Sequence, residues 1–272
     1  MATVLEKSVA QSSVTTASTL AGIVDRWIFV FMSALFVVTT LVGFIPSALG
    51  KIAAVDAGQR PPFPLVLHVH GVLMGSWLLL LLVQTVLMAT GRREFHRQLG
   101  VIAILLAPAM VVTGIILVPT MFHQSWAMLA AAPPGVPPAQ IETAKNFIRS
   151  LVGAQAAVGL LFPLFVTLAL LASRKDAGMH KRLMILATVV PLPAAIDRIA
   201  WLPTTYPDSA VSPLLYPLLW IMPMLVWDLV RHRTLHRAYL VWFAFYAPMA
   251  ALVINLWWSP WWMETVQRWM GV

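Results

Sequence analysis

The sequence predicts an all-α protein, a polytopic membrane bundle of seven transmembrane helices arranged as one leading helix plus three helical hairpins. Three observations carry this prediction. The first is composition, because 60% of the 272 residues are hydrophobic and only 10% are charged, whereas a soluble domain carries about 25% charged residues. The second is the recurrence of long apolar runs, and the third is the placement of basic residues between them.

Each of seven apolar runs is long enough to cross the ~30 Å hydrocarbon core as a helix. The first run is preceded by residues 1–26, which are rich in Ser, Thr and Ala and are predicted to form a polar cytoplasmic arm. The last run is followed by residues 259–272, a Trp-rich tail predicted to lie in the outer membrane interface. Residues 27–258 form the predicted membrane domain, with spans near 27–48, 64–90, 99–120, 148–172, 182–202, 213–230 and 238–258.

A repeated pattern identifies the three hairpins. In each, a His followed by Lys or Arg opens an apolar run, and proline interrupts that run 11 to 13 residues later. A proline at this distance lies roughly 18 Å into the helix, where it removes a backbone hydrogen bond. The fifth span carries two such prolines and is expected to bend. The three sets are His96-Arg97 with Pro108, His180-Lys181 with Pro191 and Pro193, and His236-Arg237 with Pro248.

Basic residues predict the orientation. The formal net charge is +8, and most Lys and Arg residues fall between the second and third, fourth and fifth, and sixth and seventh spans. Positive charge in short alternate loops marks the cytoplasmic side, so the amino terminus is predicted inside and the carboxyl terminus outside. This basicity orients helices and argues against a nucleic-acid partner. Histidines in these loops are interpreted as part of the same interfacial collar; they are His96, His180, His232 and His236.

No cysteine is present. Disulfides, iron–sulfur ligation, covalent c-type haem attachment and a thiol nucleophile are therefore excluded. The sequence also lacks a phosphate-binding G-x-x-x-x-G-K-[S/T] motif and the G-x-S-x-G and H-E-x-x-H hydrolase motifs. A membrane ATPase and a standard serine or zinc protease are unsupported.

Polar side chains in the outer third of the bilayer form the predicted functional site. His70 on the second span, Gln155 on the fourth, and Asp197 with Arg198 on the fifth all lie a turn or two below the predicted outer surface. His123 falls near the same boundary on the third span. A buried charge in a span costs about 2.5–3.5 kcal/mol on insertion scales, so such residues usually face the bundle interior and find partners. His68 and Asn255 lie at a similar level.

His70 is the predicted centre of this site, on one helical stripe with Met74 and Trp77. With His123 as a second ligand it could hold a haem b iron, since two axial histidines suit one-electron transfer. A copper or zinc site from His68 or His70, His123 and Asp197 is also chemically permitted. In a third interpretation His70 hydrogen-bonds Asp197 or Gln155 and only locks helices together.

Asp197 and Arg198 also have alternative interpretations. As helix neighbours they project about 100° apart and do not form an ideal ion pair with each other. In one interpretation Asp197 makes a structural pairing and Arg198 extends to the outer headgroups. In the other, Asp197 lines a binding cavity or a proton path, with Arg198 facing an anionic propionate or headgroup. The prolines just before them would then act as hinges of a transporter.

Two runs carry a family resemblance. One extends from His70 through Gln84 to His96-Arg97-Gln98-Leu99-Gly100, and the other is His180-Lys181-Arg182-Leu183-Met184 with Arg198 following. They resemble a group of uncharacterised bacterial predicted membrane proteins with an intramembrane His, a Gln near the inner end and H-R-x-L-G opening the next helix. The resemblance covers the second to fifth spans and implies a bacterial cytoplasmic (inner) membrane. A fainter similarity is to cytochrome b561-like bundles, which pair histidines inside facing helices.

The leading functional hypothesis is a non-hydrolytic membrane protein that binds a cofactor or lipophilic ligand at the outer polar cluster, with haem b or quinone electron transfer as its sharpest form. The alternatives are a proton-coupled small-solute transporter with Asp197 as the protonatable group, and a structural subunit of a larger membrane complex. Besides the lipid bilayer, the predicted partners are other membrane subunits that dock through the N-terminal arm and the Trp-rich tail.

Overall fold

The computed structural model describes residues 2–272, with side chains described from Leu20 onward. Within this range the chain forms nine helices and no strand, and seven segments are long and apolar enough to cross a membrane. The predicted all-α bundle with seven spans is therefore confirmed. The helices are α1 (Ala2–Asp56), α2 (Leu65–Ala89), α3 (Arg93–Ala130), α4 (Pro138–Ala172), α5 (Ala177–Val189), α6 (Pro193–Ile196), α7 (Val211–His232), α8 (Arg237–Leu256) and α9 (Pro260–Met270).

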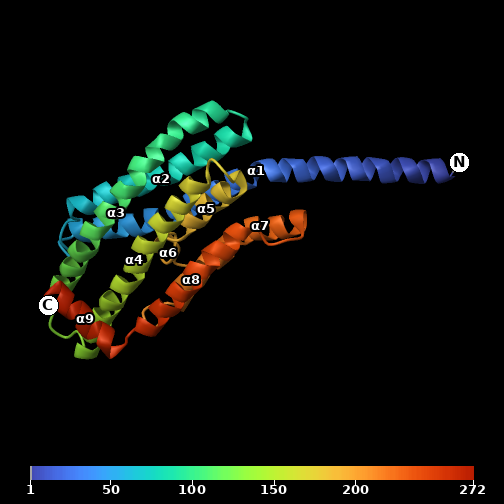
Figure 1. Cartoon of the computed structure of the whole chain (residues 1–272). Coiled ribbons are helices and arrows are strands. Elements are labelled where there is room, and N and C mark those ends of the chain that lie inside the picture. Colours follow the sequence, from blue (N-terminus) through green and yellow to red (C-terminus); the bar gives the residue numbers. More distant parts are fainter. Residues whose placement is uncertain (1) are drawn as a thin grey trace.

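The helices run back and forth, so that the connections of the three predicted hairpins gather at one end of the bundle (Figure 1). These connections are α2–α3, α4–α5 and α7–α8, and we call this the basic end because it carries most of the Lys and Arg residues. The other end carries the α1–α2, α3–α4 and α6–α7 connections. That the basic end faces the cytoplasm stays a prediction from the charge pattern.

The first helix does not stop at the predicted boundary between arm and membrane domain. α1 begins at Ala2 and continues through residue 26 to Asp56, and its membrane-crossing candidate is Leu20–Asp56. The side chains of residues 1–19, which make up most of the predicted arm, lie outside the described part of the chain.

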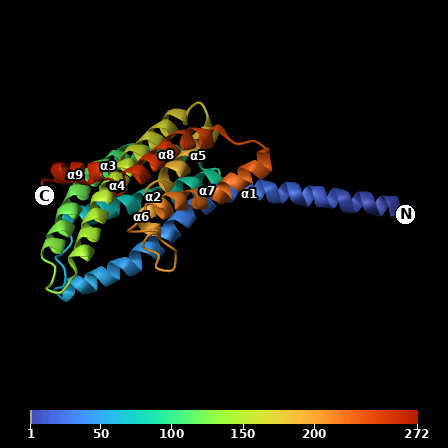
Figure 2. The same ribbon diagram turned by 90° about the horizontal axis from the view of Figure 1, so that it is seen from below.

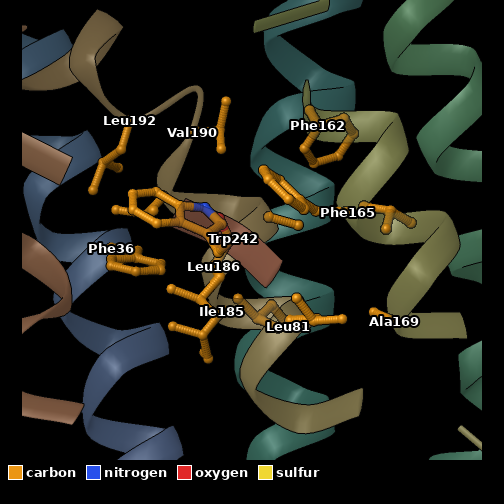
Figure 3. Close-up of a cluster of buried hydrophobic side chains, with 14 of the residues drawn as sticks. Phe36, Leu81, Phe162, Phe165, Ala169, Ile185, Leu186, Val190, Leu192 and Trp242 are labelled. Atoms are coloured by element: carbon orange, nitrogen blue, oxygen red, sulfur yellow. The ribbon is translucent and has the colours of Figure 1, made fainter. Parts of the chain in front are cut away.

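α5 is the central helix of the bundle. In the span made by α5 and α6, 61% of the apolar window is buried, against 22–33% in the other six spans. Figure 3 shows the packing that buries α5. Ile185 and Leu186 lie among Phe36 of α1, Leu81 of α2 and Trp242 of α8. Elements from most of the chain therefore converge on one short helix.

The fifth span breaks where its two prolines lie. α5 ends at Val189, and α6 begins at Pro193 after a three-residue turn. Neither Pro191 nor Pro193 has an N–H to donate, so the α-helical ladder cannot continue. The Val190 N–H turns to the Ala187 carbonyl, and the Trp242 indole donates to the Leu186 carbonyl at 2.9 Å. The fifth span is thus fully interrupted rather than only bent. The Leu186 carbonyl that this frees accepts its hydrogen bond from Trp242 of α8.

The single prolines of the other two repeats have a smaller effect. Pro108 lies inside the continuous helix α3, and Pro248 lies inside the continuous helix α8. One proline removes one ladder hydrogen bond, which a membrane helix tolerates. The repeated sequence pattern therefore produces only one discontinuous span among the three hairpins.

α6 is held against α1 by contact between backbones. A Cβ atom built on Gly43 would lie 2.0 Å from the carbonyl oxygen of Ala195. Only glycine leaves room for this approach, because any side chain would overlap the carbonyl of the facing helix. Gly43 therefore fixes the position of the segment that follows the break.

The Trp-rich tail forms α9, which lies beside the ends of α3 and α4 (Figures 1 and 2). Ser259 caps its start, and Gly271 ends it in a left-handed conformation. Trp262 is buried against Phe122 and Val152, and its indole donates to the Arg149 carbonyl at 3.2 Å. Part of the tryptophan cluster is thus internal packing, while Trp261 and Trp269 remain exposed. The interfacial position of this tail stays a prediction.

Candidate functional site

The strongest polar contact in the bundle is a buried ion pair near the basic end. The Arg182 guanidinium on α5 donates through Nε and Nη2 to the two carboxylate oxygens of Asp228 on α7, at 2.6 and 2.5 Å. The Tyr239 hydroxyl on α8 donates to Asp228 Oδ2 at 2.6 Å. Both charged side chains are 5% exposed. A bidentate, fully hydrogen-bonded pair of this kind joins three helices, so its role is structural.

The other aspartates at this end also have partners. On α1, Asp25 accepts from Trp227 Nε1 at 2.9 Å and from Arg231 Nε at 2.8 Å. In the α4–α5 connection, Asp176 caps α5 through the Met179 N–H and accepts from Arg237 at 3.0 Å. These aspartates are all engaged in contacts between helices or connections, and the remaining described carboxylate of the region, Glu94, is exposed beside Arg97.

Beside these pairs, uncharged polar side chains from two hairpins meet without completing their hydrogen bonds. They are Gln84 on α2, His96 on α3 and His180 on α5, and we call them the His–Gln site. The rings of His96 and His180 lie with their centroids 6.3 Å apart. Gly100 lies one helical turn beyond His96, and a Cβ on it would be 3.7 Å from Gln84 Nε2.

Unpaired atoms concentrate in the His–Gln site. Where side chains are described, seven buried side-chain nitrogen or oxygen atoms have no hydrogen-bond partner, and three of them lie here. They are Nε2 and Oε1 of Gln84 and Nδ1 of His96. A buried polar group left without a partner costs about 1–3 kcal/mol, and native proteins keep few of them. Such a concentration in one place indicates a site for an additional hydrogen-bonding group.

The protonation of His180 follows from its one hydrogen bond. Its Nδ1 lies 2.8 Å from the backbone carbonyl oxygen of Ala169 on α4. A carbonyl only accepts, so Nδ1 carries the proton and, in the neutral ring, Nε2 carries the lone pair. The site therefore combines an imidazole held in one tautomer with an amide whose donor and acceptor are both free.

The predicted outer cluster has a different arrangement. His70 is half-buried, and its Nδ1 is hydrogen-bonded to Thr113 Oγ1 of α3 at 2.9 Å. Near the outer end of the same helix pair, Gln124 donates to the Pro62 carbonyl at 2.8 Å. His123 follows Thr113 by ten residues, or about 15 Å along α3, and its side chain is exposed. The structure does not bring His70 and His123 together, so one iron or metal ion could not contact both in this arrangement.

Asp197 and Arg198 lie just after the break in the fifth span. Arg198 donates to the Ala194 carbonyl, and its guanidinium lies 4.7 Å from the centroid of the Phe44 ring on α1. Asp197 is half-buried, and its Oδ1 has no hydrogen-bond partner. In the described part of the chain, no hydrogen bond or ion pair links either residue to His70. The structure brings Arg198 to α1 instead.

The remaining predicted residues are dispersed. Trp77 is buried in the core and donates from Nε1 to Thr188 Oγ1 of α5 at 3.0 Å. Met74 is partly buried beside the same core. Gln155 is exposed. Among residues with described side chains, no group of three or more His, Asp or Glu is placed to hold a metal ion. His68 and Asn255 are also exposed.

His236 gives this end of the bundle a testable pH dependence. Its Nδ1 accepts the N–H of Ala238 at 3.1 Å and so caps α8. Burial is the largest cause that lowers the pKa of this imidazole from 6.5, and the nearby Arg182 charge lowers it further. The folded state thus favours the neutral ring. The resulting stabilisation is complete above pH 6.5 and is lost as the pH falls through the lowered pKa.

We therefore expect the wild-type protein to lose thermal stability between about pH 8 and about pH 5.5, on either side of the ordinary imidazole pKa. His236→Asn should lose less, because Asn caps a helix without titrating in this range. The exposed His232→Asn is the matched control and should behave as wild type. An unchanged pH dependence in His236→Asn would show that the cap does not contribute.

No protein-family model, curated protein or solved structure matches this chain.

Proposed function

We propose that this chain is a non-hydrolytic integral membrane protein that binds an organic cofactor or lipophilic ligand at the His–Gln site, in a bacterial inner membrane with the basic end toward the cytoplasm. The observation that carries the proposal is the set of three buried, unpaired polar atoms on Gln84 and His96 beside the oriented ring of His180. A bound molecule that supplies the missing partners would remove the cost of burying them.

The location differs from the outer cluster that the sequence suggested, and the reason is geometric. His70 already has a partner in Thr113, and His123 lies about 15 Å further along α3. The His–Gln site instead draws its members from two hairpins, α2–α3 and α4–α5, which meet at the basic end. A ligand bound there would contact both hairpins, as is common for cofactor sites built between the helices of a bundle.

The test is to identify what the protein carries when it is purified from membranes in mild detergent. Optical spectra of the oxidised and dithionite-reduced protein would show a haem through its Soret, α and β bands. Metal analysis and mass spectrometry of an organic extract would detect other occupants. We expect about one organic molecule per chain in the wild type, and loss of most of it from the double variant Gln84→Leu/His96→Leu.

The matched control is Gln155→Leu/His123→Leu, which makes the same two changes at exposed positions on α4 and α3. It should keep the molecule that the wild type carries. A wild-type protein that carries no organic molecule, or one whose occupancy is equal in both double variants, would contradict the proposed function.

A further inference from the structure

The hydrogen-bonding inventory of the His–Gln site restricts the chemistry of its ligand. The His180 ring has its proton on Nδ1, held by the Ala169 carbonyl, so the neutral ring accepts through Nε2. Gln84 has a free donor, Nε2, and a free acceptor, Oε1. A ligand that completes the site therefore supplies an O–H or N–H group as well as an acceptor. Molecules that only accept leave part of the site unpaired.

Charge excludes a cation. The three residues of the site include no carboxylate, while ten Lys and Arg residues lie in or beside the three connections of the basic end. The described aspartates nearby already form ion pairs with Arg182, Arg231 and Arg237. A metal ion would be repelled by the surrounding positive charge. The carboxylate nearest to the site along the chain, Glu94, is 69% exposed and faces Arg97 at 3.7 Å. The hydrogen-bonding groups of the His–Gln site and the positive charge around it together favour a neutral ligand.

The surroundings of the site suit an apolar molecule with a small polar end. A Cβ on Gly100 would already contact Gln84 Nε2 at 3.7 Å, so a side chain larger than Ala there would press on the Gln84 amide. On the adjoining turns of α2 and α3, Val83, Met88 and Phe95 are exposed apolar side chains. Deeper in the bundle, Leu81 is buried in the core. A polar ring could therefore bind at Gln84 while an apolar tail lies along the outer surface of these helices.

We propose that the ligand is a quinol, an aromatic ring with two hydroxyl groups and an apolar tail. This inference rests on the proposed function. Each hydroxyl can donate to Gln84 Oε1 or His180 Nε2 and accept from Gln84 Nε2, whereas the carbonyls of the oxidised quinone only accept. The reduced form therefore makes a hydrogen bond that the oxidised form cannot make, and the site binds the quinol more tightly.

The experiment uses the full chain in nanodiscs of synthetic phosphatidylcholine without quinones, titrated with decylubiquinol or decylubiquinone and followed by the shift in thermal unfolding. We expect the Kd of the quinol to be about tenfold lower than that of the quinone. Gly100→Leu should raise the Kd of the quinol at least about tenfold, because the larger side chain would displace the Gln84 amide. Gly100→Ala is the matched control and should bind as wild type, because 3.7 Å is an ordinary contact.

The possible failures are distinguishable. Equal affinity for both redox forms, or quinol binding that Gly100→Leu and Gln84→Leu leave unchanged, overturns the quinol inference. If neither form binds while the wild type still carries an organic molecule that Gln84→Leu/His96→Leu loses, the quinol class is wrong and the proposed function stands. If no organic molecule is found either, both proposals are wrong.

Discussion

Arg182→Met alone should destabilise the folded bundle by about 3–5 kcal/mol, because it leaves Asp228 as an uncompensated charge at a site that is 5% exposed. Tyr239 would remain as the only described side chain that donates to this carboxylate. One neutral hydrogen bond cannot offset the cost of burying an unpaired charge. The measurement is the free energy of unfolding by denaturant titration in mixed micelles, compared with the wild type.

The double variant Arg182→Met/Asp228→Leu separates pairing from packing. Removal of both charges should recover most of the stability lost in Arg182→Met, since buried ion pairs are often replaceable by apolar side chains of similar size. Tyr239→Phe is a smaller control and should cost about 0.5–3 kcal/mol, the range for a hydrogen bond to a buried charged group. A double variant as unstable as Arg182→Met would show that the loss comes from packing around the arginine rather than from the unpaired carboxylate.

Gly43→Ala should destabilise the bundle by about 1–3 kcal/mol, the range for overpacking a close contact. The new methyl group would lie 2.0 Å from the Ala195 carbonyl oxygen. The methyl group is fixed to the backbone of α1 and the carbonyl belongs to the backbone of α6, so neither can rotate away. Relief to a 3.4 Å contact requires α1 and α6 to separate by about 1.4 Å, the difference between these two distances. Thermal unfolding of the two proteins in the same detergent measures the effect.

Gly50→Ala is the matched control on the same helix, because nothing lies within 4 Å of a Cβ at that position. There the substitution should be neutral or stabilising by up to about 1 kcal/mol, since alanine favours the helix over glycine. The two variants should therefore differ in sign. If Gly43→Ala were as stable as Gly50→Ala, the close approach of α1 and α6 would be wrong.

The fold was predictable because hydropathy and loop charge act locally along a membrane chain. Apolar runs of sufficient length must become helices, since every backbone polar group has to be satisfied within the bilayer. The doubled prolines Pro191 and Pro193 also indicated a disturbed fifth span. The sequence could not distinguish a bend from a break, because that depends on whether a neighbour such as Trp242 can satisfy a freed carbonyl.

The ion pair was missed although the sequence contained a signal for it. Arg182 lies at the predicted start of the fifth span, next to the basic connection before it, whereas in the structure it lies six residues inside α5 and is buried. Asp228 is the only carboxylate in α7. When one span contains an acid and another contains a base, the two are expected to form an ion pair, because burying either charge alone is costly. Depth along a helix could suggest such partners, but only the packing of α5 against α7 brings them together.

The His–Gln site was beyond sequence reasoning for a different reason. Gln84 and the His96 motif were noted, but as parts of separate helices, and the loop histidines were interpreted as an interfacial collar. Whether a histidine is unpaired depends on its neighbours in space. His180 is held by a carbonyl of α4, while Nδ1 of His96, on α3, has no partner. The same residue type at equivalent positions of two repeats thus has different surroundings, which a sequence pattern cannot show.

The central position of α5 has a consequence for how the chain enters the membrane. The α5–α6 segment has the lowest mean hydropathy of the seven spans, 1.2, and α5 contains Arg182. An arginine within a span opposes transfer from the translocon into lipid, by about 2.5–3.5 kcal/mol at the helix centre and by less at the position of Arg182, six residues into α5. Asp228, synthesised 46 residues later, is not yet available to compensate it. We therefore expect stable insertion of α5 to depend on its packing against α4, whose mean hydropathy is 2.1, and on the later arrival of α7. The helix that organises the finished bundle is the one least able to insert by itself.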